Sequence, residues 1–125
     1  MPKIELSALK GLKQSAGQGF CDADMQSHAA NIDLSVDGTA AQKGALIHLA
    51  TAEATITLPK ASAGAVKGQI KIIISTVAAN ITIKCYSNDN DAAPADTTLG
   101  ILDGAGDFAI CVFNGTTWVA GVSLT

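Results

Sequence analysis

Residues 108–123 read Phe-Ala-Ile-Cys-Val-Phe-Asn-Gly-Thr-Thr-Trp-Val-Ala-Gly-Val-Ser and predict the β-hairpin that closes the fold. Apolar side chains alternate on both sides of Asn114 and Gly115, and an Asn-Gly pair between two alternating runs is a strong hairpin signal. We expect a type I′ turn, because Asn and Gly accept the positive φ angles that this turn requires. We also expect Trp118, at the start of the last strand, to seal the core rather than to contact a ligand.

Shorter runs of the same character precede this hairpin. Residues 54–58 and 80–86 alternate between apolar and polar side chains, and Pro59 ends the first of these runs. Residues 69–76 carry isoleucine at four positions and are apolar on both faces, which predicts a central strand. Further strand candidates are 32–36, 45–49 and 99–102. Seven or eight short strands with turn residues between them predict an all-β fold, a small antiparallel β-sandwich or barrel.

The first thirty residues lack this alternation and predict a separate N-terminal arm. Gly11, Gly17 and Gly19 interrupt a weak helical spacing, so a stable helix of about 12 residues is not expected. We therefore divide the chain into an extended or partly helical arm, 1–30, and a β-sandwich or barrel domain, 31–125. The arm has little core of its own, so its apolar side chains are the expected contacts with a neighbouring subunit: Ile4, Leu6, Leu9, Leu12 and Phe20.

The chain carries few charges. Charged residues make up 15% of its 125 residues, against about 25% in typical soluble domains. A surface with so few charges indicates that part of it is covered by copies of the chain or by a larger assembly. All eight basic residues are lysines, and the net charge is −3. Without arginine or a basic stripe, binding to nucleic acid or to a membrane surface is not expected.

The three cysteines, Cys21, Cys85 and Cys111, show no zinc-binding spacing. Cys85 and Cys111 lie in predicted strands, where a free cysteine acts as a small buried hydrophobe, and a bridge between the two is the alternative. The first residues lack the apolar segment of a signal peptide, and no run approaches about 18 apolar residues. We therefore expect neither a leader peptide nor a transmembrane helix.

Only a few of the acidic residues are candidates for a metal site. Asp89 and Asp91 stand in a loop of alternating Asp and Asn, whose oxygen atoms are the kind that Ca²⁺ prefers. Neither the glycine nor the distal glutamate of an EF-hand follows them. We interpret this loop, and Asp103 and Asp107 beside the next glycine-rich turn, as carboxylates that hydrogen-bond their own backbone. No metal or cofactor is expected.

His28 and His48 are the two histidines of the chain. A hydrolase triad would need a serine or cysteine presented to one of them, and no G-x-S-x-G segment does this. We expect His48 to point to the polar side of its strand or into an interface, and His28 to lie in the arm. The prediction is therefore a protein that is not an enzyme. The competing hypothesis, a small metal-dependent enzyme, would use Asp89, Asp91 and a histidine.

Several segments between Ala54 and Thr125 resemble small β-domains of tailed-bacteriophage virion proteins. They are Thr-Ile-Thr-Leu-Pro at 55–59, Gly-Gln-Ile-Lys-Ile at 68–72, Asn-Ile-Thr-Ile at 80–83 and Phe-Asn-Gly-Thr-Thr-Trp at 113–118. That group includes capsid decoration (cement) proteins, head-fibre bases and tail-fibre modules. The short chain and its unusual arm favour a decoration protein within this group.

This resemblance implies a structural virion protein without catalytic or cofactor sites. Decoration proteins of this kind commonly sit as homotrimers at threefold positions, with arms that run across neighbouring capsid subunits. The implied partners are copies of the chain and the major capsid protein, and the implied location is the capsid surface of a virion made in the host cytoplasm. A protein that binds only the assembled shell, and not its free subunits, would stabilise the shell by mass action. The alternative is a carbohydrate- or receptor-binding β-module of a phage fibre, with Trp118 and Phe113 as an aromatic platform.

Overall fold

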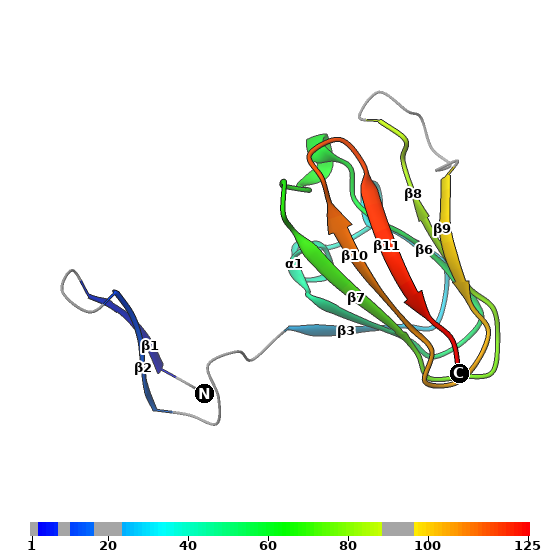
Figure 1. Ribbon diagram of the computed structural model, residues 1–125, viewed down its shortest axis with the longest axis horizontal. Helices are drawn as coiled ribbons and strands as arrows, with labels where there is room; N and C mark the ends of the chain where they lie inside the picture. The colour runs from blue at the N-terminus through cyan, green and yellow to red at the C-terminus, as the bar shows by residue number, and fades with distance from the viewer. Residues whose placement is uncertain (1–2, 8–10, 17–23, 89–96) are drawn as a thin grey trace.

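The computed structural model describes residues 3–7, 11–16, 24–88 and 97–125, with the backbone alone for 3–7, 11–16 and Ala41. From residue 24 onward, nine described strands form two sheets that face each other (Figure 1). The strand order is β11-β10-β7-β5-β3 in one sheet and β4-β6-β8-β9 in the other. β1 Lys3–Ser7 and β2 Gly11–Ala16 form an antiparallel hairpin that pairs with neither of these sheets.

The elements have the following bounds. The five-stranded sheet consists of β3 Met25–His28, β5 Ile47–Ala50, β7 Ile70–Ser75, β10 Phe108–Phe113 and β11 Trp118–Ser123. The four-stranded sheet consists of β4 Ile32–Asp33, β6 Ala54–Thr57, β8 Ile81–Cys85 and β9 Thr97–Leu102. A short helix, α1 Ala40–Gly44, and a 3-10 turn, η1 Ala61–Ala63, lie in the connections.

From β3 to β8, the chain crosses to the opposite sheet after every strand. Each pair of consecutive strands therefore makes one turn of a flattened coil. Successive turns stack in parallel, so that Ile32 lies beside Ile56 and Ile56 lies beside Ile83 in the four-stranded sheet. β9, β10 and β11 then complete the two sheets with antiparallel pairings.

The prediction of a β-rich sandwich is confirmed, but its strand number and its antiparallel pairing are wrong. The two sheets contain nine described strands rather than seven or eight, and both sheets are mixed. The reason lies in the connections: residues 51–53 join β5 in one sheet to β6 in the other. A connection of this length also fits a hairpin, so the spacing of strands in the sequence does not distinguish the two geometries.

β3 lies within the range 1–30 that the sequence assigned to the arm, and yet it belongs to the five-stranded sheet. It runs parallel to β5, from Met25 beside Ile47 to His28 beside Ala50. Its sequence, Met-Gln-Ser-His, shows no apolar alternation. A buried histidine rather than an apolar side chain anchors this strand, and that is why the pattern did not predict it.

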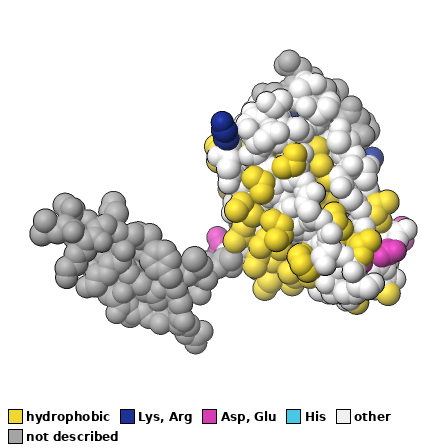
Figure 2. Space-filling view, in the orientation of Figure 1, with side chains coloured by type: hydrophobic (Ala, Val, Ile, Leu, Met, Phe, Trp, Pro, Cys, Tyr) yellow, Lys and Arg dark blue, Asp and Glu magenta, His cyan; other side chains and the backbone are white. Residues whose placement is uncertain are grey.

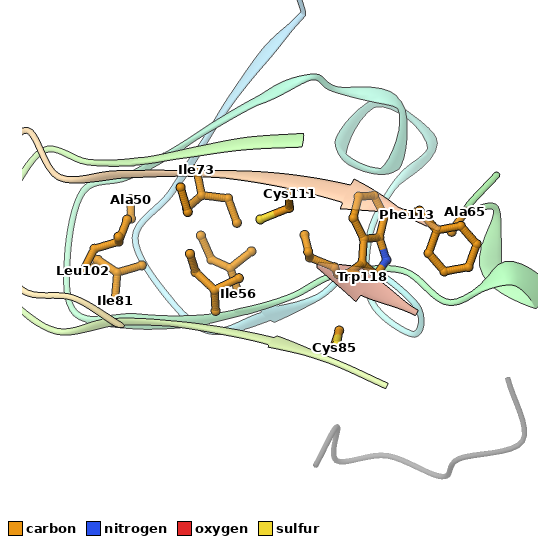
Figure 3. Close-up of a cluster of buried hydrophobic side chains, with 13 residues drawn as sticks. Ala50, Ile56, Ala65, Ile73, Ile81, Cys85, Leu102, Cys111, Phe113 and Trp118 are labelled. Carbon is orange, nitrogen blue, oxygen red and sulfur yellow. The ribbon is translucent and has the colours of Figure 1, made fainter. Parts of the chain in front are cut away.

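The hydrophobic core lies between the two sheets (Figure 3). β7 is the middle strand of the five-stranded sheet, as its isoleucines predicted. Cys85 and Cys111 are buried free thiols, so the alternative of a bridge between them is wrong. The buried members of the core are Ala50, Ile56, Leu58, Ala65, Ile73, Ile81, Ile83, Cys85, Leu102, Ala109, Cys111, Phe113 and Trp118.

The closing hairpin is confirmed, but its turn differs from the prediction. Phe113 pairs with Trp118, so residues 114–117 connect the two strands. Gly115 has a φ of 107°, whereas no described residue other than glycine has a positive φ, which excludes a type I′ turn at Asn114. The Asn114 side-chain oxygen instead accepts hydrogen bonds from two backbone N–H groups of the loop, at 2.9 and 3.0 Å. These bonds allow Asn114 to stabilise a longer loop without adopting a left-handed conformation itself.

Candidate interaction surface

The outer face of the five-stranded sheet is apolar, and Figure 2 shows hydrophobic side chains gathered over β7, β10 and β11. Strand register places thirteen residues on this face, in rows that cross the sheet. Three of them are small, Ser27, Gly121 and Ser123, and none is charged. We call this surface the apolar face; its ten large hydrophobic residues are Met25, Ile47, Leu49, Ile70, Ile72, Ile74, Phe108, Ile110, Val112 and Val119.

The alternation along β7 produces this face. Lys71, Ile73 and Ser75 point into the sandwich and are fully buried. Ile70, Ile72 and Ile74 alternate with them and point outward, and Ile70 is 46% exposed. On β10, Ile110 likewise points outward and is 45% exposed. Side chains of a type normally found in cores therefore form a contiguous solvent-facing surface, which is typical of an interaction site.

The outer face of the four-stranded sheet has the opposite character. Thr82 and Lys84 of β8 point outward there, while Ile81 and Ile83 of the same strand are buried. Its outward positions include Asp33, Thr55, Thr82, Lys84, Thr98 and Ile101. Ile101, 48% exposed, is the one large hydrophobic residue among these six. The fold thus has one polar and one apolar outer face.

A buried polar cluster of His28, His48 and Lys71 lies on the inner side of the five-stranded sheet. The two imidazole rings are stacked, with centroids 5.1 Å apart, and His28 Nε2 lies 2.9 Å from His48 Nδ1. His48 Nε2 lies 3.2 Å from the carbonyl oxygen of Ala45. Because a carbonyl only accepts hydrogen bonds, neutral His48 carries its proton on Nε2, and its Nδ1 accepts from His28 Nε2–H.

The Lys71 ammonium group is held by backbone carbonyl groups. Its Nζ donates hydrogen bonds to the carbonyl oxygens of Lys43 and Ala45, each at 2.7 Å. These oxygens lie at the C-terminal end of α1, where a helix leaves carbonyl groups unpaired and attracts cations. Burial lowers the pKa of Lys71 to about 8. Burial, followed by the nearby Lys71 charge, lowers the pKa of His48 to about 4, and burial also lowers the pKa of His28.

Both histidine predictions are wrong. His48 points into the sandwich and is fully buried, and His28 lies in the sheet with 4% of its surface exposed. Both ring nitrogens of His48 and the Nε2 of His28 have hydrogen-bond partners inside the protein, which makes the burial of these polar rings possible. Since all three side chains of the cluster are buried, it presents no open surface to a substrate.

The sequence patterns predicted neither α1 nor the cluster beside it. The helix begins with a capping box: Thr39 N–H donates to Gln42 Oε1 at 2.8 Å, and Gln42 N–H donates to Thr39 Oγ1 at 3.2 Å. This T-x-x-Q pattern is a recognisable signal for a helix start. Lys71, a single charge within a run of isoleucines, is the corresponding signal for a buried cation.

The carboxylate of Asp107 is fully buried and satisfied by the protein itself. It accepts hydrogen bonds from the backbone N–H groups of Asp103 and Gly104, and from both the N–H and the hydroxyl of Thr125. The bonds from Thr125 are the main reason that the pKa of Asp107 falls to about 2. The interpretation of Asp107 as a backbone-bonding carboxylate is confirmed.

The loop with Asp89 and Asp91, which we interpreted as carboxylates that hydrogen-bond their own backbone rather than as a metal site, lies outside the described residues. Within the part of the chain that the structure describes, no group of three or more His, Cys, Asp and Glu side chains is placed to hold a metal ion.

Trp118 is a core residue, as the sequence predicted. It is 2% exposed, and its indole N–H donates a hydrogen bond to the carbonyl oxygen of Pro59 at 2.6 Å. Its ring packs at a tilt against Phe113, with centroids 5.4 Å apart. A sugar needs an exposed aromatic face, and these two buried rings do not provide one.

The five apolar residues proposed as arm contacts have no described side chains. Ile4 and Leu6 lie on β1, and Leu6 is the register partner of Leu12 on β2. Leu9 and Phe20 lie outside the described residues. Their contact with a neighbouring subunit stays a prediction.

No helix in the described parts of the chain has the length and apolar character needed to cross a membrane. Compared with known proteins, the chain matches no protein family, no curated protein and no solved structure.

Proposed function

We propose that this chain is a structural virion protein of a tailed phage, a capsid decoration protein that binds the assembled head as a homotrimer. The observation that carries the proposal is the apolar face of the five-stranded sheet. Large exposed apolar surfaces on otherwise polar proteins mark interaction sites. The low charge content of the whole chain fits the same interpretation.

The chemistry of the apolar face favours a protein over a small or charged ligand. Ser27 and Ser123 contribute the only side-chain hydroxyls among its thirteen positions, and none of the thirteen is charged. A sugar or a nucleic acid needs many more hydrogen bonds or cations than these positions offer. Another apolar protein surface needs neither, and it releases water from both sides when it binds.

The capsid part of the proposal rests on the resemblance to phage β-domains and on the arm. β1 and β2 pair with each other and with neither sheet, so the sandwich is complete without them. An arm of this kind is suited to lie across a neighbouring capsid subunit. If it binds the assembled shell and not free subunits, the protein stabilises the shell by mass action.

Cosedimentation with expanded heads of the phage that encodes the chain tests this proposal. We expect the full chain to sediment with the heads and to raise the temperature at which they rupture. A chain that lacks residues 1–23 keeps every strand of both sheets, and we expect it to lose attachment while its Trp118 fluorescence stays native. A full chain that stays in the supernatant would contradict the proposal.

A further inference from the structure

We infer that the apolar face is the interface between copies of this chain, and that three copies place it around a common threefold axis. The inference rests on the proposed homotrimer and names the surface that forms it. The occupant of the face is therefore the same face of two further copies.

The charge pattern permits this contact. Because none of the thirteen positions on the face is charged, copies that meet through it bring no like charges together. A partner with a charged surface would lose hydration there without gaining an ion pair. The polar outer face of the other sheet, with Asp33 and Lys84, is left to solvent or to the capsid.

The width of the sheet suits three copies. With about 4.8 Å between neighbouring strands, five strands span about 19 Å. In a triangular prism with sides of this width, each sheet lies about 5.5 Å from the axis, close to half of the ~10 Å that separates packed sheets. Side chains from three such sheets therefore fill the centre of the prism without leaving a channel. Ile72, in the middle strand and the middle row, lies nearest the axis.

The area of the face is the same in either arrangement. The thirteen positions cover on the order of 450 Å² of sheet in each copy, from the spacing of strands and residues. Each copy contributes this area whether two or three copies meet, so the width of the sheet is what favours three.

Light scattering on the full chain and two matched lysine variants tests the inference. Ile110→Lys adds a charge to the apolar face, and Ile101→Lys adds the same charge at a similarly exposed isoleucine on the other sheet. We expect the wild type and Ile101→Lys to have about three times the monomer mass of 12.6 kDa. We expect Ile110→Lys to fall to one third of that mass, because trimer formation would bury three ammonium groups close to the axis.

Native Trp118 fluorescence serves as the folding check for each variant. If Ile110→Lys does not fold, Val119→Lys takes its place, because Val119 lies on the edge strand of the same face and is 51% exposed. A folded face variant that keeps the trimer mass would overturn the inference, as would a wild type that is a monomer or a dimer.

The head-binding assay separates this inference from the proposed function. If the wild type is a trimer that Ile110→Lys dissociates, but the wild type never binds phage heads, the proposed function is overturned and the interface stands. If Ile110→Lys stays a trimer and still binds heads, the interface is overturned and the proposed function stands. A monomeric wild type whose head binding is lost in Ile110→Lys would make the capsid the occupant of the face and overturn the inference.

Discussion

Lys71 has a buried ammonium group whose hydrogen-bond partners are carbonyl oxygens at the end of α1. Carbonyl dipoles compensate a buried charge less fully than water does, and so burial lowers the pKa of this lysine. His48 shares the Ala45 carbonyl oxygen with Lys71, which brings two groups that can carry positive charge close together. The charge state of this cluster therefore affects the stability of the fold.

The Lys71 pKa predicts a stability that rises at alkaline pH. Between about pH 8, the pKa in the folded protein, and its ordinary value of 10.5, the unfolded chain binds a proton that the folded chain has released. The free energy of unfolding therefore increases with pH across this window. Urea unfolding at one fixed protein concentration, followed by Trp118 fluorescence, measures the effect.

Lys71→Met is the matched variant, since it keeps the length of the side chain and removes the charge. We expect the unfolding free energy of the wild type, minus that of the variant, to rise from pH 8 to 10. The Cys111 thiol, whose pKa burial raises to about 12, has the opposite slope in both proteins and cancels in the difference. A difference that is constant with pH would contradict this account of Lys71.

The His48 pKa predicts a loss of stability at acidic pH. Its value is about 4 in the folded protein and 6.5 ordinarily, so the unfolded chain binds more protons between these limits. The free energy of unfolding therefore falls as the pH drops from 6.5 to 4. We expect His48→Gln to show a smaller fall over this window in the same urea measurement, and an equal fall would show that the ring does not titrate in this way.

At the scale of elements, the two sheets meet along a seam between β9 and β11. A Cβ atom added to Gly100 would lie 2.7 Å from Cγ2 of Val122, which is closer than real Cβ contacts. The glycine is therefore required for a close approach of two strands and not for a special φ angle, since Gly100 is not among the glycines with positive φ. This seam closes the sandwich on the side opposite β3 and β4.

Gly100→Ala is expected to destabilise the protein by about 1–3 kcal/mol, the usual cost of an overpacked contact. Val122→Ala removes the clashing methyl groups. We therefore expect Gly100→Ala to cost much less stability when it is added to Val122→Ala than when it is added to the wild type. Gly44→Ala is the control, because nothing lies within 4 Å of its added Cβ and it lies outside the apolar face. Chemical unfolding of the four proteins measures the coupling, and equal effects in both backgrounds would argue against the contact.

At the scale of the whole molecule, the sandwich is a three-turn coil closed by antiparallel strands. Each turn contributes one strand to each sheet, and the apolar face extends across strands from all three turns and from the closing hairpin. The N-terminal hairpin pairs with neither sheet. Folding and the proposed attachment to a capsid therefore use different parts of the chain.

This division predicts that removal of residues 1–23 leaves the stability of the sandwich nearly unchanged. The truncated chain retains the complete core cluster and both sheets. We expect its urea midpoint to match that of the full chain at the same concentration. A large drop in the midpoint would mean that the arm packs on the sandwich, and the arm deletion would then no longer be a clean test of capsid binding.

Periodicity was a sufficient guide where strands have one apolar side. The strands 54–58 and 80–86 were predictable because their alternating side chains meet a core on one face. The closing hairpin was predictable from the Asn-Gly pair between its two apolar runs. β3 was not predictable in this way, because its buried anchor is a histidine whose partner lies on β5. The parallel coil was also hidden, since unequal steps along the chain separate Ile32, Ile56 and Ile83.

The sequence by itself determined the β-rich class, most strand positions, the closing hairpin and the core role of Trp118, because each depends on local alternation and turn chemistry. Only the tertiary structure decided which side of β7 is buried. In β7, alternation places Ile70, Ile72 and Ile74 on one side and Lys71 and Ser75 on the other, and hydrophobicity alone would bury the isoleucines. The structure buries Lys71, because the carbonyl groups that satisfy it come from α1, far away in the sequence. The isoleucines are left outside, and they form the centre of the apolar face.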